Sequence, residues 1–121
     1  MAAVFIEARS FTESVVDYFS DDVDYQEFQL SLLENPEKGD VIQGCGGLRK
    51  TRWRHQKRGK GSRGGLRIIY LFVPELAQFF LLDVYSKGEA DDLSQDERRM
   101  LAQLAEQYKL AALERARRKR G

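Results

Sequence analysis

The chain has 121 residues, of which 42% are hydrophobic, and its formal net charge is +1. This length predicts a single domain over residues 1–121 with one modest core, and no apolar run approaches the roughly 18 residues of a membrane-spanning helix. The only cysteine, Cys45, excludes an internal disulfide and suggests a reducing compartment. Because the first residues also lack the basic and apolar regions of a secretory signal, we expect a cytoplasmic protein.

The first part of the chain predicts a strand followed by a helix. Residues 3–7 are apolar and rich in β-favouring side chains, so they favour a short strand. Ser10 is a candidate start for the helix, because Glu13 follows it at the spacing of a capping box.

A second helix is predicted to start at Ser20 or Asp21. It is expected to end at Asn35-Pro36, because the residue before a proline avoids the helical conformation. Two helices that are joined by so short a connection should pack as a hairpin.

Three further strands are predicted over residues 48–54, 66–73 and 78–85. The last two are apolar at odd and even positions alike, so both should be central strands covered on both faces. Pro74-Glu75 begins the turn between them, which favours an antiparallel hairpin. Residues 36–47 are expected to be a loop with a brief extended piece at 41–42.

The C-terminal part predicts a helix that starts at Ser94, with Glu97 in the capping-box position. We expect its buried stripe to consist of Leu101, Leu104, Tyr108 and Ala111. Residues 115–121 form a basic tail, which suits either the negative end of this helix or a nucleic acid. The predicted order is β-α-α-β-β-β-α, an α+β domain with helices packed on an antiparallel-rich sheet.

A basic stretch lies in the middle of the chain. Nine of the 20 Lys and Arg residues, and none of the 19 acids, fall between positions 49 and 67. Such a local positive field favours a polyphosphate ligand such as nucleic acid, although a solvated loop or an acidic partner would also account for it. The residues that we expect to contact such a nucleic acid are Arg49, Lys50, Arg52, Arg54, Arg58, Arg63, Arg117 and Arg118.

Arg67 is the basic residue with the clearest chemical role. Strand alternation puts it on the same face as Ile69, Leu71 and Val73. A guanidinium in such an apolar strand needs an anionic partner, which could be a bound phosphate or Asp83 on the next strand.

The predicted hairpin would bring Tyr85, Lys87 and Glu89 towards Arg67 and the loop lysines. RNA can be cut there without a metal if its own 2′-hydroxyl is aligned on the adjacent phosphate and the protein supplies acid, base and cations. One histidine (His55) and one cysteine cannot build a closed zinc site. We expect His55 to be an incidental residue of a mobile basic loop and Cys45 an unreactive loop thiol.

Three segments resemble the HigB branch of the RelE-like toxins of bacterial toxin–antitoxin pairs. They are G-D-x-I-x-G-x-G-G-L-R-K at 39–50, the Lys/Arg/Gly-rich segment ending in R-I-I-Y at 57–70, and Y-x-K-x-E-x-x-D-L at 85–93. This resemblance covers roughly residues 4–107. It implies the RelE-type α+β fold and ribosome-dependent mRNA cleavage, without a metal or other cofactor, that leaves 2′,3′-cyclic phosphate and 5′-hydroxyl ends.

The resemblance also implies roles for individual residues and for partners. Arg67 matches the family's phosphate-binding arginine, Lys57 and Lys60 lie where the family has catalytic lysines, and Lys87 matches the basic residue after the last strand. The implied partners are the 70S ribosome, mRNA and an antitoxin encoded by a neighbouring gene, HigA-like and with a helix-turn-helix. No membrane partner is expected.

The chain departs from the RelE pattern near its last strand. Gly88 and Ala90 stand where that pattern has arginines, and no tyrosine occurs over residues 91–97, so Tyr85 is the candidate that could stack on an RNA base. Two other functions stay open: a ParE-like toxin that acts on DNA gyrase, and a non-catalytic protein that binds RNA or the ribosome.

Overall fold

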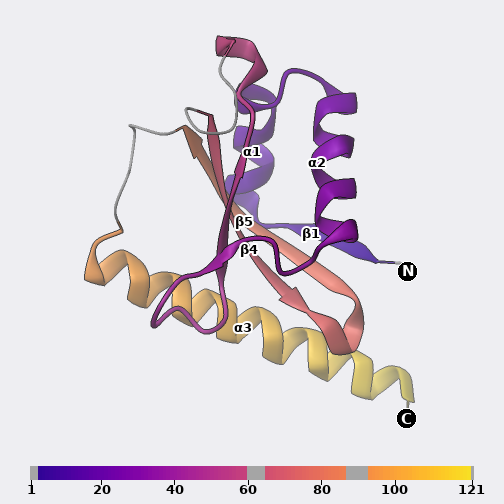
Figure 1. The fold of residues 1–121 in the computed structure, drawn as a ribbon. Helices are drawn as coiled ribbons and strands as arrows, with labels where there is room; N and C mark the ends of the chain where they lie inside the picture. Colours follow the sequence, from indigo (N-terminus) through magenta and orange to yellow (C-terminus); the bar gives the residue numbers. More distant parts are fainter. Residues whose placement is uncertain (1–2, 60–64, 87–92, 121) are drawn as a thin grey trace.

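Five strands form one mixed sheet in the order β1-β5-β4-β3-β2 (Figure 1). The structure, a computed structural model, describes residues 3–59, 65–86 and 93–120. The strands are β1 (Val4–Glu7), β2 (Asp40–Val41), β3 (Arg49–Trp53), β4 (Leu66–Val73) and β5 (Gln78–Ser86). Only β1 and β5 pair in parallel, and the other neighbours are antiparallel, so the predicted antiparallel-rich α+β fold is confirmed.

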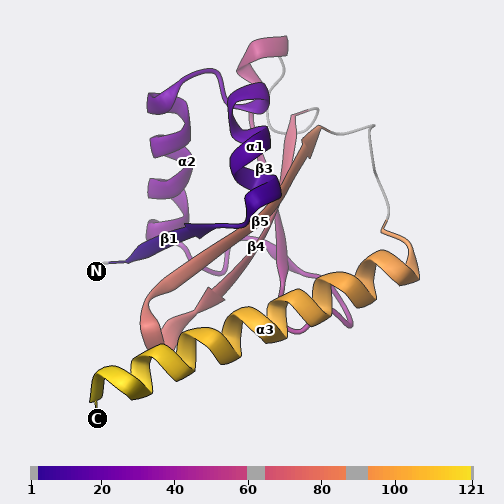
Figure 2. The same ribbon diagram turned by 180° about the vertical axis from the view of Figure 1, so that it is seen from behind.

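Helices cover both faces of the sheet, as Figures 1 and 2 show. The helices are α1 (Arg9–Tyr18), α2 (Asp22–Glu34) and α3 (Gln95–Arg120), with short 3₁₀ turns η1 (Gln56–Arg58) and η3 (Pro74–Leu76). The hairpin of α1 and α2 covers one face and α3 crosses the other. Within the three described ranges, no helix combines the length and the apolar character that a bilayer span requires.

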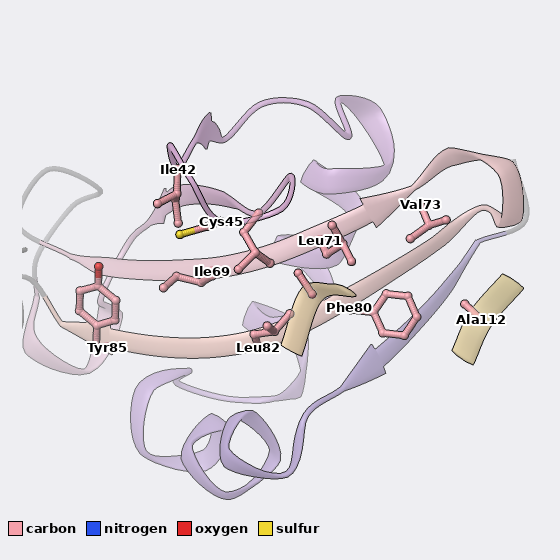
Figure 3. Close-up of a cluster of buried hydrophobic side chains, with 11 residues drawn as sticks. Ile42, Cys45, Ile69, Leu71, Val73, Phe80, Leu82, Tyr85 and Ala112 are labelled. Atoms are coloured by element: carbon pink, nitrogen blue, oxygen red, sulfur yellow. The ribbon is translucent and has the colours of Figure 1, made fainter. Parts of the chain in front are cut away.

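The central strands β4 and β5 contribute to two separate cores because they are apolar on both faces. The core under α1 and α2 is largely aromatic, with Phe11, Phe28 and Phe79 fully buried. The core under α3 contains Ile69, Leu71 and Phe80 and is drawn in Figure 3. This confirms that residues 66–73 and 78–85 are central strands.

The register of β4 on β5 contains one irregularity. Arg67 lies opposite Tyr85 and Ile69 lies opposite Asp83, but Tyr70 lies opposite Leu81, so one extra β5 residue fits between these pairs. Such a bulge bends the strand and increases its twist. The side chains of β4 before the bulge therefore keep the alternation that the sequence predicts, with Arg67 on the α3 face beside Ile69.

The starts of the helices confirm two of the three expectations. Asp21 caps α2 by accepting from the Asp24 N–H at 2.8 Å, and Ser94 and Glu97 form the reciprocal capping box of α3 at 3.0 and 3.1 Å. The prediction of a capping box formed by Ser10 and Glu13 is wrong. There α1 begins after Ala8, and the Ser10 hydroxyl donates to the Leu82 carbonyl of β5 at 3.1 Å instead.

The buried stripe of α3 differs from the expected one. Ala105 and Ala112 are fully buried, whereas Leu104 is 39% exposed, and Ala111 is also exposed. The reason is a close approach: a Cβ built on Gly46, whose φ is +65°, would lie 3.5 Å from the Cβ of Ala105. Small residues therefore face the loop that α3 crosses, and the larger ones lie along its sides.

Tyr70 fixes the loop that leads into β2. Its fully buried side chain donates from the hydroxyl to the Pro36 carbonyl at 2.8 Å and accepts from the Gly39 N–H at 3.0 Å. Burial raises the pKa of this hydroxyl, which stays protonated and can donate. A Cβ on Gly39 would lie 2.9 Å from the Tyr70 ring, so glycine is required at this position.

Replacing Tyr70 with Phe should therefore destabilise the protein. The substitution keeps the ring but leaves the buried Gly39 N–H without its acceptor, which should lower the free energy of unfolding by about 1–3 kcal/mol. Urea denaturation followed by circular dichroism measures this. Tyr108→Phe is the matched control, because that ring packs on Phe80 at the other face of the sheet. Equal stability of the two variants would contradict the assignment.

Candidate functional site

Three basic side chains form a row on the α3 face of the sheet. Arg52 lies opposite Arg67, and Lys50 lies opposite Ile69, in the antiparallel pairing of β3 with β4. Because Ile69 belongs to the core under α3, alternation puts Lys50, Arg52 and Arg67 on that same face. We call these three residues the basic row.

The basic row lines a pocket at the β2–β3 edge of the sheet. Its volume is about 490 Å³, and the lining side chains are those of Lys38, Asp40, Lys50, Thr51, Arg52, Trp53 and Arg67. Four cations and one carboxylate therefore surround this pocket, which we call the basic pocket. A phosphate is the kind of group that such a set of donors recognises, because arginine forks match its oxygens in pairs.

Arg67 and Tyr85 are brought together by the strand register, as the sequence predicts. The two residues lie directly opposite one another, and one Arg67 Nη donates to the Leu66 carbonyl at 3.2 Å. Asp83, the alternative partner, lies opposite Ile69 instead. Tyr85 is only 7% exposed and belongs to the core under α3. Figure 3 shows it at the end of that core away from Val73 and Ala112, and its buried ring offers little surface for stacking on a base.

Lys38 is a pocket residue that sequence reasoning missed. Its ammonium donates to the Ser31 hydroxyl at 3.0 Å and lies 5.5 Å from the centre of the Trp53 ring. Burial lowers the pKa of Lys38, an effect that the charge of Glu34 partly opposes. Its position outside the basic stretch gave no signal, because only the contacts of the 36–39 loop bring it to the pocket.

Two of the arginines that we expected to bind RNA are held by protein groups. One Nη of Arg49 donates to the Gly39 carbonyl at 2.8 Å and the Glu37 carbonyl at 3.2 Å. Arg54 pairs with Glu27 and, through Nε, with the buried Asp24 at 3.1 Å. Both guanidinium groups thus hold parts of the fold together, so the presence of these two arginines in the basic stretch is explained without a ligand.

The buried carboxylate of Asp24 organises the other face of β3. One of its oxygens accepts from Trp53 Nε1 at 3.0 Å and from Arg54 Nε at 3.1 Å, and the other accepts from the Ser20 N–H at 3.2 Å. The Arg54 guanidinium also lies over the Trp53 ring, 4.7 Å from its centre. This network orients Trp53, one wall of the basic pocket.

Lys57 is not brought to the basic row. It lies in η1, and its ammonium donates to the Val16 carbonyl of α1, which covers the opposite face of the sheet. His55 is 2% exposed with its ring 5.9 Å from that of Tyr18. The expectation that His55 lies in a mobile loop is therefore wrong. Cys45 is fully buried under α3, which agrees with its expected place in a loop.

Several expected site residues lie elsewhere or outside the described residues. Arg117 and Arg118 lie near the end of α3, where both pair with Glu114. Those outside the described residues are Lys60, Arg63, Lys87, Gly88, Glu89 and Ala90, and of Arg58 only the backbone is described. Within the described ranges, no three His, Cys, Asp or Glu side chains gather as a metal site would require.

The comparisons with known proteins concern the fold. No family model matches the chain. A mutant of the E. coli toxin RelE in the free state aligns with a TM-score of 0.52 and 21% identity, over 75% of this chain and 88% of that one. The isolated E. coli RelE toxin aligns with a TM-score of 0.51 and 18% identity, over 83% of this chain and all of that one.

This chain has the RelE-like fold. The fold that the sequence resemblance implied is therefore confirmed. Assignment to the HigB branch stays a prediction, because both of the structures compared above are of RelE itself. Within the RelE-like fold of this chain, β3 and β4 carry the basic row and β5 carries Tyr85.

Asp83 is an acidic group on the strand that carries Tyr85. Burial raises the pKa of its carboxyl and the charge of Glu97 raises it further, while the Val84 N–H, at 2.9 Å from Oδ1, opposes them. In the unfolded chain Asp83 would ionise near its ordinary pKa of about 3.9. The ionised Asp83 carboxylate therefore lowers the free energy of unfolding at pH values above its pKa in the folded protein. This penalty shrinks as the pH falls and disappears below the pKa of Asp83 in the unfolded chain.

The variant Asp83→Asn should thus be more stable than the parent at pH 7, and the gain should shrink as the pH falls towards about 4. The amide keeps an oxygen for the Val84 N–H. Thermal unfolding at a series of pH values measures the difference. Glu75→Gln is the control, since that residue is exposed in η3. A gain at Asp83 that does not change with pH would contradict the burial argument.

Proposed function

We propose that this chain is the toxin of a type II toxin–antitoxin pair, and that it inhibits translation by cutting mRNA on the ribosome without a metal. The observation that carries this proposal is the basic row of Lys50, Arg52 and Arg67, which lines one pocket with Lys38. The RelE-like fold and the sequence resemblance to HigB toxins support it.

The reaction that this pocket suits is attack of an RNA 2′-hydroxyl on its adjacent phosphate. The oxygen–phosphorus bond to the next nucleotide breaks, which leaves a 2′,3′-cyclic phosphate and a 5′-hydroxyl end. Negative charge on the phosphate oxygens grows as the fifth bond forms. Donors of Arg67 and Arg52 aimed at those oxygens would stabilise this charge, since preorganised cations act most strongly where charge develops.

Proton transfer requires one group that accepts the 2′-hydroxyl proton and one that donates to the leaving 5′-oxygen. We assign these roles to lysines, with Lys50 in the pocket as the first candidate. Lys60 and Lys87 remain candidates from the resemblance, because Lys87 directly follows β5 and Lys60 precedes β4 in the chain. Tyr85 is assigned a positioning role opposite Arg67 rather than a stacking role.

The ribosome would supply what this pocket lacks. Its volume is about 490 Å³, which is in the range of small-molecule sites, so it can hold the scissile phosphate and an adjoining nucleotide but not a longer stretch of RNA. An mRNA held in the decoding site would present the 2′-hydroxyl in line with the leaving oxygen, and such alignment can account for much of a rate enhancement. The proposed location is therefore the cytoplasm, and the proposed inhibitor is a HigA-like antitoxin that covers the pocket or keeps the toxin off the ribosome.

Replacing Arg67 or Arg52 with Ala should reduce mRNA cleavage by about two orders of magnitude, the usual effect of losing one donor to a developing oxyanion. The measurement is primer extension on a defined mRNA with translating ribosomes, with EDTA added after the complex has formed. Arg9→Ala is the control, because Arg9 pairs with Glu13 on exposed α1. Growth inhibition without any cuts would favour the gyrase-type reading, and undiminished cleavage by both variants would exclude this site.

Lys50→Ala should reduce cleavage more than Lys57→Ala does. Lys50 lines the pocket, whereas the Lys57 ammonium is turned to the Val16 carbonyl on the other side of the sheet. Single-turnover rates on ribosome-bound mRNA compare the two variants, and unfolding curves check that each is folded. A larger loss of cleavage in Lys57→Ala would contradict this assignment and favour Lys57 as a catalytic residue, as the resemblance implies.

A further inference from the structure

Asp40 carries the one carboxylate among the side chains that line the basic pocket. The pairing of β2 with β3 puts it directly opposite Lys50. Because residues that lie opposite one another in an antiparallel pair direct their side chains to the same face, Asp40 is on the α3 face with the basic row. Within the described ranges, its exposed carboxylate has no hydrogen bond or ion pair to another protein group.

The other side chains of the pocket offer donors. Lysine and arginine side chains carry no hydrogen-bond acceptor, and the Trp53 indole N–H already donates to Asp24 at 3.0 Å. Thr51 has a hydroxyl, but this residue is 5% exposed and lies opposite Ile68 in the core under α1 and α2. Among the side chains of this pocket, Asp40 is therefore the one that can accept a hydrogen bond with a charged group.

The backbone of RNA matches this set of donors and one acceptor. Its phosphate and ring oxygens can only accept hydrogen bonds, whereas the 2′-hydroxyl can also donate one. The cations of the pocket would therefore take the phosphate oxygens, and the 2′-hydroxyl is the backbone group that can donate to Asp40. Without this hydrogen bond, a carboxylate beside a bound phosphate would only repel it.

The positions of these residues on the sheet fit this division of contacts. Arg52 and Arg67 lie opposite one another, and Asp40 is the diagonal neighbour of Arg52 across the β2–β3 pair. Diagonal neighbours in an antiparallel pair are about 7–8 Å apart. A phosphate that bridges the two arginines would thus keep its charge away from the carboxylate, while the 2′-hydroxyl beside that phosphate could reach it.

We propose that Asp40 is a catalytic residue that binds the 2′-hydroxyl of the cleaved nucleotide and accepts its proton, a role that rests on the ribonuclease function proposed above. Asp40 thus takes the accepting role, and the lysines keep the donating role, with Lys50 as the first candidate. At neutral pH an aspartate is ordinarily ionised and a lysine is ordinarily protonated, so each group starts in the form that its role requires.

The proton transfers of this reaction balance within the pocket. As the 2′-oxygen bonds to phosphorus, its proton passes to a carboxylate oxygen of Asp40. The bond from phosphorus to the 5′-oxygen breaks, and that oxygen takes a proton from the Lys50 ammonium. Because Asp40 and Lys50 lie opposite one another, the proton can return from the carboxyl group to the neutral amine, which restores both residues.

The experiment measures single-turnover cleavage of ribosome-bound mRNA by the full chain. Asp40→Asn keeps the shape of the side chain but removes the proton acceptor, so the cleavage rate at saturating toxin should fall by at least about 100-fold. The toxin concentration that gives half of this rate should not rise, because the pocket loses a negative charge. Glu37→Gln is the matched control and should cut as the parent does. It removes a carboxylate from the same loop, but Glu37 lies 3.9 Å from Arg49 and does not line the pocket.

A second variant separates this role from a merely structural pairing of Asp40 with Lys50 across β2 and β3. Asp40→Glu keeps a carboxylate and should cut faster than Asp40→Asn, while thermal unfolding shows that both variants are folded. Equal rates for the parent and Asp40→Asn would overturn the role of Asp40 and leave the proposed function standing. A loss of rate that follows the loss of thermal stability in both variants would also overturn it. A parent protein that cuts no mRNA would overturn the proposed function itself, and the role of Asp40 with it.

Discussion

The antiparallel pairing of β4 with β5 is the constraint on which the rest of this structure depends. Both strands are buried on both faces, so α1 and α2 must cover one side and α3 the other. A slip of one residue would exchange the two faces of a strand and expose one of its apolar sets. The same register puts Arg67 opposite Tyr85, so the hydrophobic pattern of the two strands decides which face carries this guanidinium.

The sequence predicts these strands and their faces because the apolar pattern is long and unambiguous. It predicts α3's capping box equally well, since Ser94 and Glu97 are three residues apart and each accepts from the other's backbone N–H. The start of α1 is a different case: Ser10 has the right spacing for a cap, but a carbonyl of β5 competes for its hydroxyl. Tertiary contacts also explain why Ala105 rather than Leu104 is buried, because Ala105 faces the loop at Gly46.

The candidate site is predicted less completely, because a count of charges does not say which face each charge occupies. Within the basic stretch, Arg49 and Arg54 turn to carbonyls and carboxylates of the protein, and Lys57 turns to α1. Lys50 and Arg52 instead follow Arg67 because of the β3–β4 register. The β3–β4 register therefore determines which of these cations line the pocket and which contact other parts of the protein. The spacing of the basic residues along the chain does not reveal this difference.

This separation has an electrostatic consequence for any polyanion that approaches. Arg54 pairs with Asp24 and Glu27, and Arg49 lies 3.9 Å from the Glu37 carboxylate, so the charges of these two cations are largely neutralised at short range and contribute little field beyond a Debye length. Lys50, Arg52 and Arg67 share a pocket with a single carboxylate, Asp40. A polyanion would therefore be attracted to the β2–β3 edge more than to the start of α2, where Asp21 and Asp22 are exposed acids. Within the described part of the chain, the β3–β4 register thus gathers Lys50, Arg52 and Arg67 at one edge of the sheet.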